Sequence, residues 1–126
     1  MAEYKIIING RFPGINEYTS ACRTHKQKGG ALKKNSQNEI QWQLSGQCKK
    51  LNIAKPVHLN YNFFEKDKRR DLDNISGFFH KIFQDALVQC GILKNDNWHC
   101  ITGFSDAFYV DAKRPRIEII IKEVER

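Results

Sequence analysis

Long apolar runs are missing from this sequence, and their absence excludes a membrane-spanning protein. Apolar stretches such as residues 6–8 and 78–83 are short, and His80 and Lys81 interrupt the second one. A membrane-spanning helix needs roughly 20 consecutive apolar residues. The N-terminus also lacks a basic leader followed by an apolar segment, so we expect no secretory signal and a cytoplasmic location.

Closely spaced cysteines are missing as well. The sequence contains no C-x-x-C pair, and its four cysteines are Cys22, Cys48, Cys90 and Cys100. In a chain without a secretory signal, this spacing favours free, buried thiols over disulfides. The alternative is a zinc site, whose ligands would be His80, Cys90, His99 and Cys100. These spacings match no common zinc-binding pattern, so free thiols remain the expectation.

Acidic residues are fewer than basic ones. The 21 lysines and arginines outnumber the 14 acidic residues, which gives a net charge of +7 and a pI near 9.3. A small basic chain with no membrane segment favours an anionic partner, most often nucleic acid, although a need for solubility alone would explain the same charge. With 126 residues, 40% of them hydrophobic and 28% charged, residues 1–126 fit one soluble domain with its own core.

Four segments have the patterning of β-strands. Residues 4–8 are apolar and β-branched, and the turn dipeptide Asn9-Gly10 follows them. Residues 57–63 and 116–124 alternate apolar and polar side chains, which is typical of a strand buried on one face. Residues 98–109 show apolar alternation too. We therefore expect a sheet of about four strands.

Two longer helices are expected between these strands. Ser36 and Glu39 have the spacing of a capping box, which predicts a helix over about residues 37–50. Apolar residues recur at helical intervals over residues 75–90, and Gly91 is suited to end that helix. Residues 10–35 are rich in glycine and lysine and predict a basic loop with a short helix near residues 17–23. Such a loop would follow a phosphate backbone or simply be a mobile surface segment.

The order of these elements predicts the fold class. It is β-α-β-α-β-β, which indicates one α/β (α+β) domain with a mixed or antiparallel sheet of about four strands, covered by two main helices.

Two carboxylates, Asp71 and Asp73, follow the basic run of residues 66–70 at the start of the long helix. Side chains two positions apart point to the same side only in an extended chain. The pair can therefore converge if Asp71 is still extended, as an N-cap residue is. A helix N-terminus favours negative charge, and carboxylate oxygens suit Mg²⁺. The structural alternative is that Asp71 caps the helix and Asp73 complements its dipole.

A third carboxylate, Asp96, follows the same helix. Some 20 helical residues span about 30 Å, so the helix itself cannot bring Asp96 to the other two acids. A reversal of the chain or the symmetry of a dimer would be needed. Otherwise Asp96 is a turn residue beside Asn95 and Asn97.

Five short motifs occur in a fixed order along the chain. They are Pro13-Gly14-Ile15-Asn16-x-Tyr18, Arg69-Arg70-Asp71-Leu72-Asp73-Asn74, Lys81-x-x-x-Asp85-Ala86-Leu87, Gly91-Ile92-Leu93-Lys94-Asn95-Asp96 and Pro115-Arg116-Ile117-Glu118. Each motif is weak alone. The ordered set covers nearly the whole chain and resembles the RusA-like Holliday-junction resolvases.

This resemblance implies a metal-dependent endodeoxyribonuclease that resolves Holliday junctions or related branched DNA in recombination and repair. Asp71, Asp73 and Asp96 would correspond to the family's metal-binding catalytic carboxylates, with Mg²⁺, or Mn²⁺ in its place, as cofactor. The implied assembly is a homodimer, because a two-fold symmetric four-way junction asks for two related active sites. The cations that would bind DNA phosphates are Lys66, Lys68, Arg69 and Arg70.

The sequence departs from the family pattern at two points. Many members have a lysine three residues after the asparagine of the Asp-x-Asp-Asn motif, where this chain has Gly77. The lysine that matches the Asp-Ala-Leu end of the motif is Lys81, which would reach the DNA or pair with Asp85 at i+4. The acidic pair usual after the helix is Asn95-Asp96 here, so the resemblance carries over only the second acid.

Two other functions remain open on sequence grounds. A non-catalytic basic DNA-binding module of the same fold would bind DNA in a salt-sensitive way without cutting it. An RNA-associated domain is the third reading, although most aromatic residues fall on core-facing positions rather than on a stacking surface.

Overall fold

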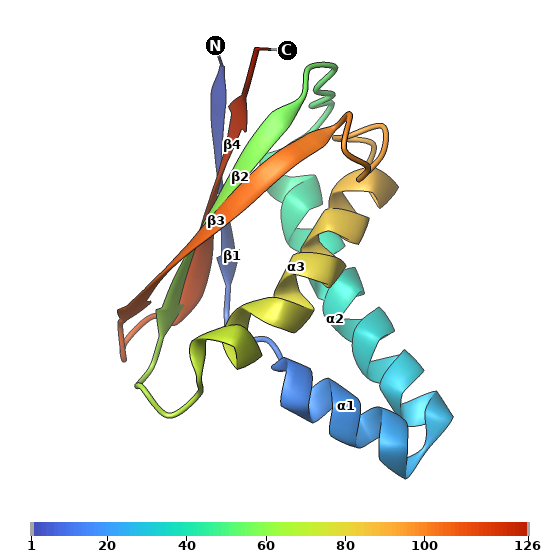
Figure 1. The fold of residues 1–126 in the computed structure, drawn as a ribbon, viewed down its shortest axis with the longest axis vertical. Helices are drawn as coiled ribbons and strands as arrows, with labels where there is room; N and C mark the ends of the chain where they lie inside the picture. Colours follow the sequence, from blue (N-terminus) through green and yellow to red (C-terminus); the bar gives the residue numbers. More distant parts are fainter. Residues whose placement is uncertain (1, 126) are drawn as a thin grey trace.

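A four-stranded sheet with helices against one face forms the frame of the protein (Figure 1). The computed structural model describes residues 2–125. Along the chain the elements are β1 (Glu3–Asn9), α1 (Ile15–Thr24), α2 (Lys26–Gln47), β2 (Val57–Glu65), α3 (Leu72–Gln89), β3 (Ile101–Val110) and β4 (Arg116–Glu123). The strand order is β1-β4-β2-β3, with β2 and β3 parallel and the other neighbours antiparallel. The expected α+β class and four-stranded sheet are confirmed, and two long helices and one short helix are present.

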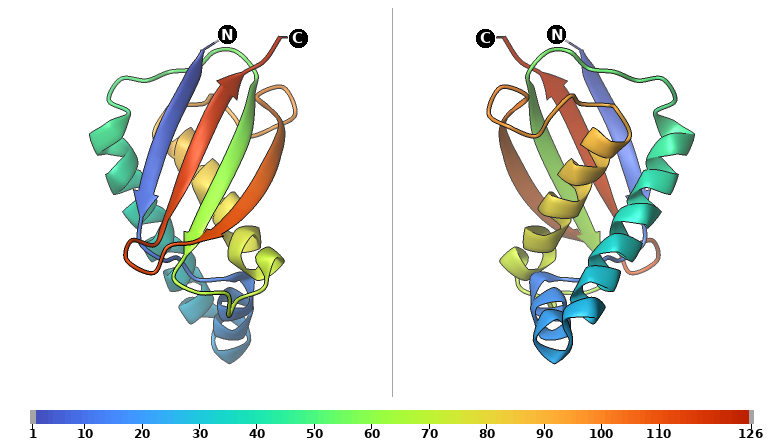
Figure 2. Two further views of the ribbon diagram at one scale, coloured as in Figure 1. Left: turned by 90° about the vertical axis from the view of Figure 1, so that its left-hand side faces the viewer. Right: turned by 90° about the vertical axis from the view of Figure 1, so that its right-hand side faces the viewer.

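Alternating side chains of the strands form one side of the core. The buried residues of β2 and β4 are Val57, Leu59, Tyr61, Phe63, Ile117, Ile119 and Ile121. Figure 2 shows that α2 and α3 lie across the same face of the sheet. The apolar stripe of α3 packs there, with Phe79 and Phe83 at most 1% exposed. Within residues 2–125, no helix is long and apolar enough to cross a membrane.

The segment predicted as a basic loop is instead helical. The short helix expected near residues 17–23 is confirmed as α1, but α2 already begins at Lys26. Ser36, predicted to cap a helix, is buried inside α2, so that capping box is wrong. Gly29 contributed to the prediction of a loop, but it lies where α2 packs on α1, since a Cβ at this position would clash with the Sγ of Cys22. The glycine permits close packing of α1 on α2 and does not mark a loop.

The long helix agrees with the prediction at its C-terminal end. Gly91 follows α3 with a φ of 74°, the left-handed conformation that glycine adopts easily. All four cysteines are free, as expected. Their expected burial is wrong, because Cys22 and Cys90 are exposed and the other two are only partly buried.

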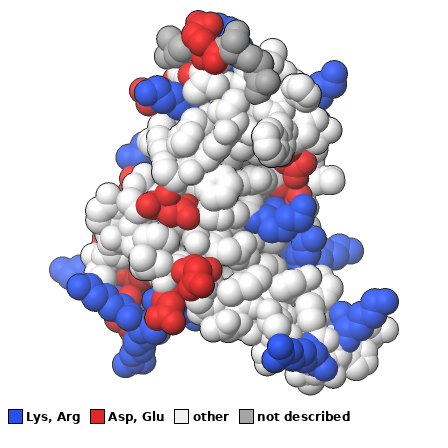
Figure 3. Space-filling model, viewed as in Figure 1, with Lys and Arg blue, Asp and Glu red and all other residues white. Residues whose placement is uncertain are grey.

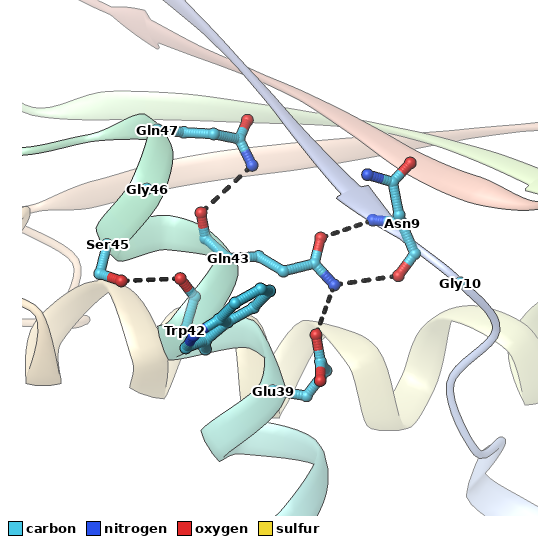
Figure 4. Close-up of a pocket in the computed structure, with 8 residues that line it drawn as sticks. All are labelled: Asn9, Gly10, Glu39, Trp42, Gln43, Ser45, Gly46 and Gln47. Carbon is cyan, nitrogen blue, oxygen red and sulfur yellow. Dashed lines mark hydrogen bonds between the residues drawn. The ribbon is translucent and has the colours of Figure 1, made fainter.

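The two edges of the sheet differ. Along β1, side-chain amides of α2 take the place of a neighbouring strand. Gln43 accepts a hydrogen bond from the N–H of Asn9 at 2.7 Å and donates to its carbonyl at 3.1 Å (Figure 4). Gln47 forms the same pair of bonds with Ile7 at 2.9 and 2.6 Å. At the other edge, β3 pairs with β2 alone among the described strands.

Candidate active site

Arg70 fixes the connection between β2 and α3. Its side chain is only 13% exposed and donates to both carboxylate oxygens of Glu65, at 3.0 and 2.9 Å. It also donates to the carbonyl of Phe12 at 2.9 Å and lies 3.7 Å from Glu17 of α1. Arg70 therefore ties β2, α1 and the start of α3 together, and its guanidinium is directed at protein groups.

Glu17, in α1, is a further carboxylate near the Arg70 guanidinium. Burial works to raise the pKa of Glu17, but hydrogen bonds from Arg11 and from the Gly14 N–H outweigh it and hold the pKa below its ordinary value. The positive charges of Arg11 and Arg70 act in the same direction. The carboxylate thus remains charged at neutral pH and contributes to holding α1 beside the start of α3.

Asp71 and Asp73 lie at the N-terminus of α3. Asp71 is the N-cap residue with φ −69° and ψ 155°, so it is extended as the sequence predicts. Its side chain forms no capping hydrogen bond, and Asp73 follows in the first turn. Both side chains are exposed, and neither has a hydrogen bond or ion pair with the described residues. Two carboxylates are therefore available to an external cation at a helix end that favours negative charge.

Asn74 connects two of the motifs found in the sequence. Its Oδ1 accepts a hydrogen bond from the N–H of Asn16 at 2.8 Å. A Cβ at Gly14 would lie 2.5 Å from the same oxygen, so only glycine allows this close approach. One turn further along, Tyr18 stacks on Phe78 with ring centroids 4.8 Å apart. The Pro13–Tyr18 segment thus supports the first turn of α3, where the two acids lie.

The β2–α3 loop is basic on its exposed side. Lys66, Lys68 and Arg69 are exposed, and the side chain of Arg69 remains 85% exposed although it lies 3.5 Å from Asp67. Lys68 and Asp71 line a surface groove together with Tyr109 near the end of β3. Figure 3 shows Lys and Arg gathered at the lower left, where this loop lies, with acidic side chains beside them. Cations and free carboxylates therefore share one surface.

Lys81 lies further along α3. Its side chain is 61% exposed, and its Nζ donates to Asp85 at 3.1 Å. Asp85 is also 3.8 Å from Lys33 of α2. The i+4 pair that the spacing allowed is therefore present, and a contact between Lys81 and DNA stays a prediction.

Asp96 lies beyond the opposite end of α3. It is exposed in the turn before β3, and it lines a groove with Gln84 and Phe104. The 18 residues of α3 make the helix about 27 Å long. Within residues 2–125, no three His, Cys, Asp or Glu side chains form a group able to hold a metal. Reversal of the chain thus does not bring Asp96 to the other acids, and the zinc alternative has no structural counterpart.

A histidine–aspartate pair lies between the two ends of α3, and the sequence reasoning missed it. His80 Nε2 is 2.8 Å from Asp106 Oδ1, and both side chains are at most 20% exposed. Beside it, Gln84 donates to the hydroxyl of Tyr61 at 3.1 Å, and burial raises the pKa of Tyr61 well above its ordinary value. The His80–Asp106 contact holds β3 against α3, and the Gln84–Tyr61 contact holds β2 against the same helix. The sequence feature that could have indicated this pair is His80 itself, because it interrupts the apolar run of residues 78–83.

Taken together, the fold and these surfaces define a small basic α+β protein with a carboxylate site suited to a cation and to phosphate groups. Comparison with known families is consistent with this class. A sequence profile described as Endodeoxyribonuclease RusA matches residues 16–122 of the 126-residue chain. The chain therefore belongs to the RusA endodeoxyribonuclease family, which places it among nucleases and confirms the resemblance seen in the sequence. A search of curated proteins finds no match.

Proposed function

We propose that this protein is a metal-dependent endodeoxyribonuclease that resolves Holliday junctions or related branched DNA in recombination and repair. The observation that carries the proposal is the free pair Asp71 and Asp73 at the N-terminus of α3, next to the exposed cations of the β2–α3 loop. Family membership supports the reaction class, which is hydrolysis of a phosphodiester bond in DNA.

The donor set suits Mg²⁺, or Mn²⁺ in its place. Asp71 and Asp73 offer hard carboxylate oxygens that no cationic side chain of the described residues occupies. A third acid, Asp96, completes the set only if it comes from a second chain. A bound divalent ion would supply Lewis-acid activation of the scissile phosphate and of the attacking water.

The surrounding residues divide into two roles. Lys66, Lys68 and Arg69 are exposed and bind backbone phosphates, which orients DNA without reading its sequence. Arg70 is a positioning residue, because its bonds to Glu65 and Phe12 hold the start of α3. Lys81 reaches the DNA only by exchanging its bond to Asp85 for a phosphate.

The proposed partners are branched DNA and a second copy of the chain. Two related active sites match the two-fold symmetry of a four-way junction, so a homodimer nicks opposed strands in one encounter. A cytoplasmic location is part of the same proposal, since four free cysteines suit a reducing compartment.

A synthetic four-way junction incubated with the protein, with and without Mg²⁺, tests this function on a denaturing gel. We expect paired symmetric nicks only with the metal. Asp73→Asn and Asp96→Asn should each abolish the nicks while junction binding, followed by gel shift, stays intact. Glu3→Gln removes an exposed carboxylate on β1, away from the site, and should cut normally.

Two outcomes contradict the proposal. Full cleavage by either aspartate variant would remove these acids from the active site. Salt-sensitive binding by the wild-type protein, with no metal-dependent product, would instead identify the non-catalytic DNA-binding module.

A further inference from the structure

We propose that Cys48 and Cys90 are a modification site, at which a small-molecule disulfide such as oxidised glutathione converts the two free thiols into a reversible intramolecular disulfide. The bond would join the end of α2 to the end of α3 and close the loop of residues 48–90. This pairing does not depend on the proposed nuclease function.

Both cysteines occupy the same position on neighbouring helices. Cys48 is the C-cap residue of α2, and Cys90 is the C-cap residue of α3. Their N–H groups donate to the carbonyls of Leu44 and Ala86 at 2.8 and 2.9 Å, so each cysteine continues the hydrogen bonding of its helix. The two helices lie across one face of the sheet and both end towards the chain termini (Figures 1 and 2). Two thiols are therefore held at one end of the fold.

The segments that follow the two helices are bonded to each other. The N–H of Ile53 donates to the carbonyl of Ile92 at 2.8 Å, and Ile53 forms an isolated parallel bridge with Leu93. The side-chain amide of Asn52 donates to the carbonyl of Gly91 at 3.3 Å. These contacts fix the chain after α2 beside the chain after α3.

The path from each cysteine to this junction is short. The N–H of Leu51 donates to the carbonyl of Cys48 at 3.1 Å, so a turn leads from Cys48 to Asn52. On the other side, Gly91 follows Cys90 directly. A disulfide needs its two Cα atoms within about 7 Å of each other, and contacts this close to both cysteines favour such an approach.

The two thiols are close enough to act on each other. Burial raises the pKa of Cys48, and the negative charge of a Cys90 thiolate raises it further. Charges in salt solution act over only about 10 Å, so this interaction indicates that the two sulfur atoms are neighbours. The electrostatic contact and the bonded segments thus indicate the same pair.

Exposure assigns an order to the reaction. Cys90 is exposed and Cys48 is only partly exposed, so the small disulfide reaches Cys90 first. The Cys90 thiolate attacks one sulfur of the small disulfide, which forms a mixed disulfide and releases one small thiolate. The Cys48 thiolate then attacks the Cys90 sulfur and releases the second small thiolate. Two protein thiols are oxidised, one small disulfide is reduced to two thiols, and the protons pass through solvent.

The environment of the thiols makes this bond slow to form and long-lived. Burial raises the pKa of Cys90 as well as that of Cys48, and a helix C-terminus disfavours negative charge. Few thiolates are then present at neutral pH, and each sulfur is a poor leaving group once the bond exists. A rapid peroxide sensor needs a low-pKa thiolate instead. The pair is therefore suited to stabilise the fold under oxidising conditions.

Titration of the wild-type protein with glutathione buffers of increasing oxidised-to-reduced ratio tests the pairing. We expect the free thiols to fall from four to two, and peptide mapping to find Cys48 linked to Cys90. The oxidised protein should melt roughly 5–10 °C higher, because the bond constrains the unfolded chain. Excess reductant should restore four free thiols and the original melting temperature.

Three results with the wild-type protein would overturn the proposal. The first is a protein that keeps four free thiols, or that carries only mixed disulfides, at the most oxidising ratio. The second is a native-state link that includes Cys22 or Cys100. The third is an oxidised protein that melts no higher than the reduced one, which would show that the bond strains the fold.

Serine variants test the order of the two steps. Cys48→Ser should accumulate the mixed disulfide on Cys90, seen as the added mass of one glutathionyl group. Cys90→Ser should form no link and leave Cys48 largely unmodified. Cys22→Ser and Cys100→Ser are the matched controls and should form the bond as the wild-type protein does. Loss of the bond in either control while its circular dichroism stays native, or a link that persists in Cys90→Ser, would contradict the assignment.

Discussion

Two adjacent arginines, Arg69 and Arg70, have opposite environments. The side chain of Arg69 is 85% exposed, whereas that of Arg70 is 13% exposed and bonded to Glu65 and Phe12. Both residues lie in the loop between β2 and α3, where one side chain faces solvent and the other faces the protein. The basic run therefore contains an exposed arginine that is available to an anionic partner and a poorly exposed one that holds the loop in place.

Substitution of these arginines should separate the two roles. Arg70→Ala leaves Glu65 without its partner in a poorly exposed site and should lower the free energy of unfolding by roughly 3 kcal/mol. Arg69→Ala should change it by less than about 0.5 kcal/mol, because surface substitutions rarely do more. Junction binding should weaken in Arg69→Ala. Urea denaturation and gel-shift titration at fixed salt measure both effects, and equal losses of stability would contradict the assigned environments.

Among the elements, α2 contacts both the helix α1 and the edge strand β1. It packs against α1 through Gly29 and closes the β1 edge through Gln43 and Gln47. Neither contact is visible as a helical motif, because a glutamine on a helix surface is ordinarily a solvated residue. The structural role of Gln43 and Gln47 depends on the strand β1 that lies beside them.

Opening the β1 edge should have a measurable cost. Gln43→Ala and Gln47→Ala each remove two hydrogen bonds to the backbone of β1 and should each lower the free energy of unfolding by about 1–2 kcal/mol. The double variant should also associate into larger species than the wild-type protein does, since an uncovered strand edge is a template for pairing with another chain. Gln27→Ala in the first turn of α2 serves as the control. Denaturation and light scattering follow the two effects, and an unchanged double variant would show that the edge needs no cover.

At the scale of the whole molecule, positive charge is concentrated in the α1–α2 hairpin. Residues 18–38 contain no acidic residue and carry Arg23, Lys26, Lys28, Lys33 and Lys34. The hairpin extends below the sheet in Figure 1, and Figure 3 shows cations around it. Because Asn74 anchors the start of α1 beside Asp73, this charge lies on an arm that leaves the candidate active site. The arm is suited to guide a DNA duplex towards the acids.

Neutralising this arm should change the salt dependence of binding. Lys26→Gln with Lys28→Gln should reduce the slope of log affinity against log salt concentration by up to about 2, one unit for each lost phosphate contact. Lys49→Gln with Lys50→Gln removes the same charge beyond the other end of α2 and should leave the slope unchanged. Junction titrations over a salt series measure the slope for each double variant. Equal slopes for the two double variants would exclude the arm from the DNA interface.

Local patterning alone determined most of the fold and the backbone conformation at Asp71. The strands, the long helix with Gly91 at its end and the extended conformation of Asp71 follow from periodicity and from helix-end preferences, which act over a few residues. The pairing of Lys81 with Asp85 follows from helical spacing for the same reason.

Only the tertiary structure decided the features that depend on distant neighbours. Gly29 resembles a loop residue until Cys22 lies against it, and Arg70 resembles a DNA ligand until Glu65 and Phe12 surround it. The family resemblance groups Asp96 with Asp71. The helix between them is about 27 Å long, however, and it keeps the two residues apart within one chain. The rigid helix α3 therefore separates Asp96 from Asp71 and Asp73 within the chain, and only the tertiary structure shows this separation.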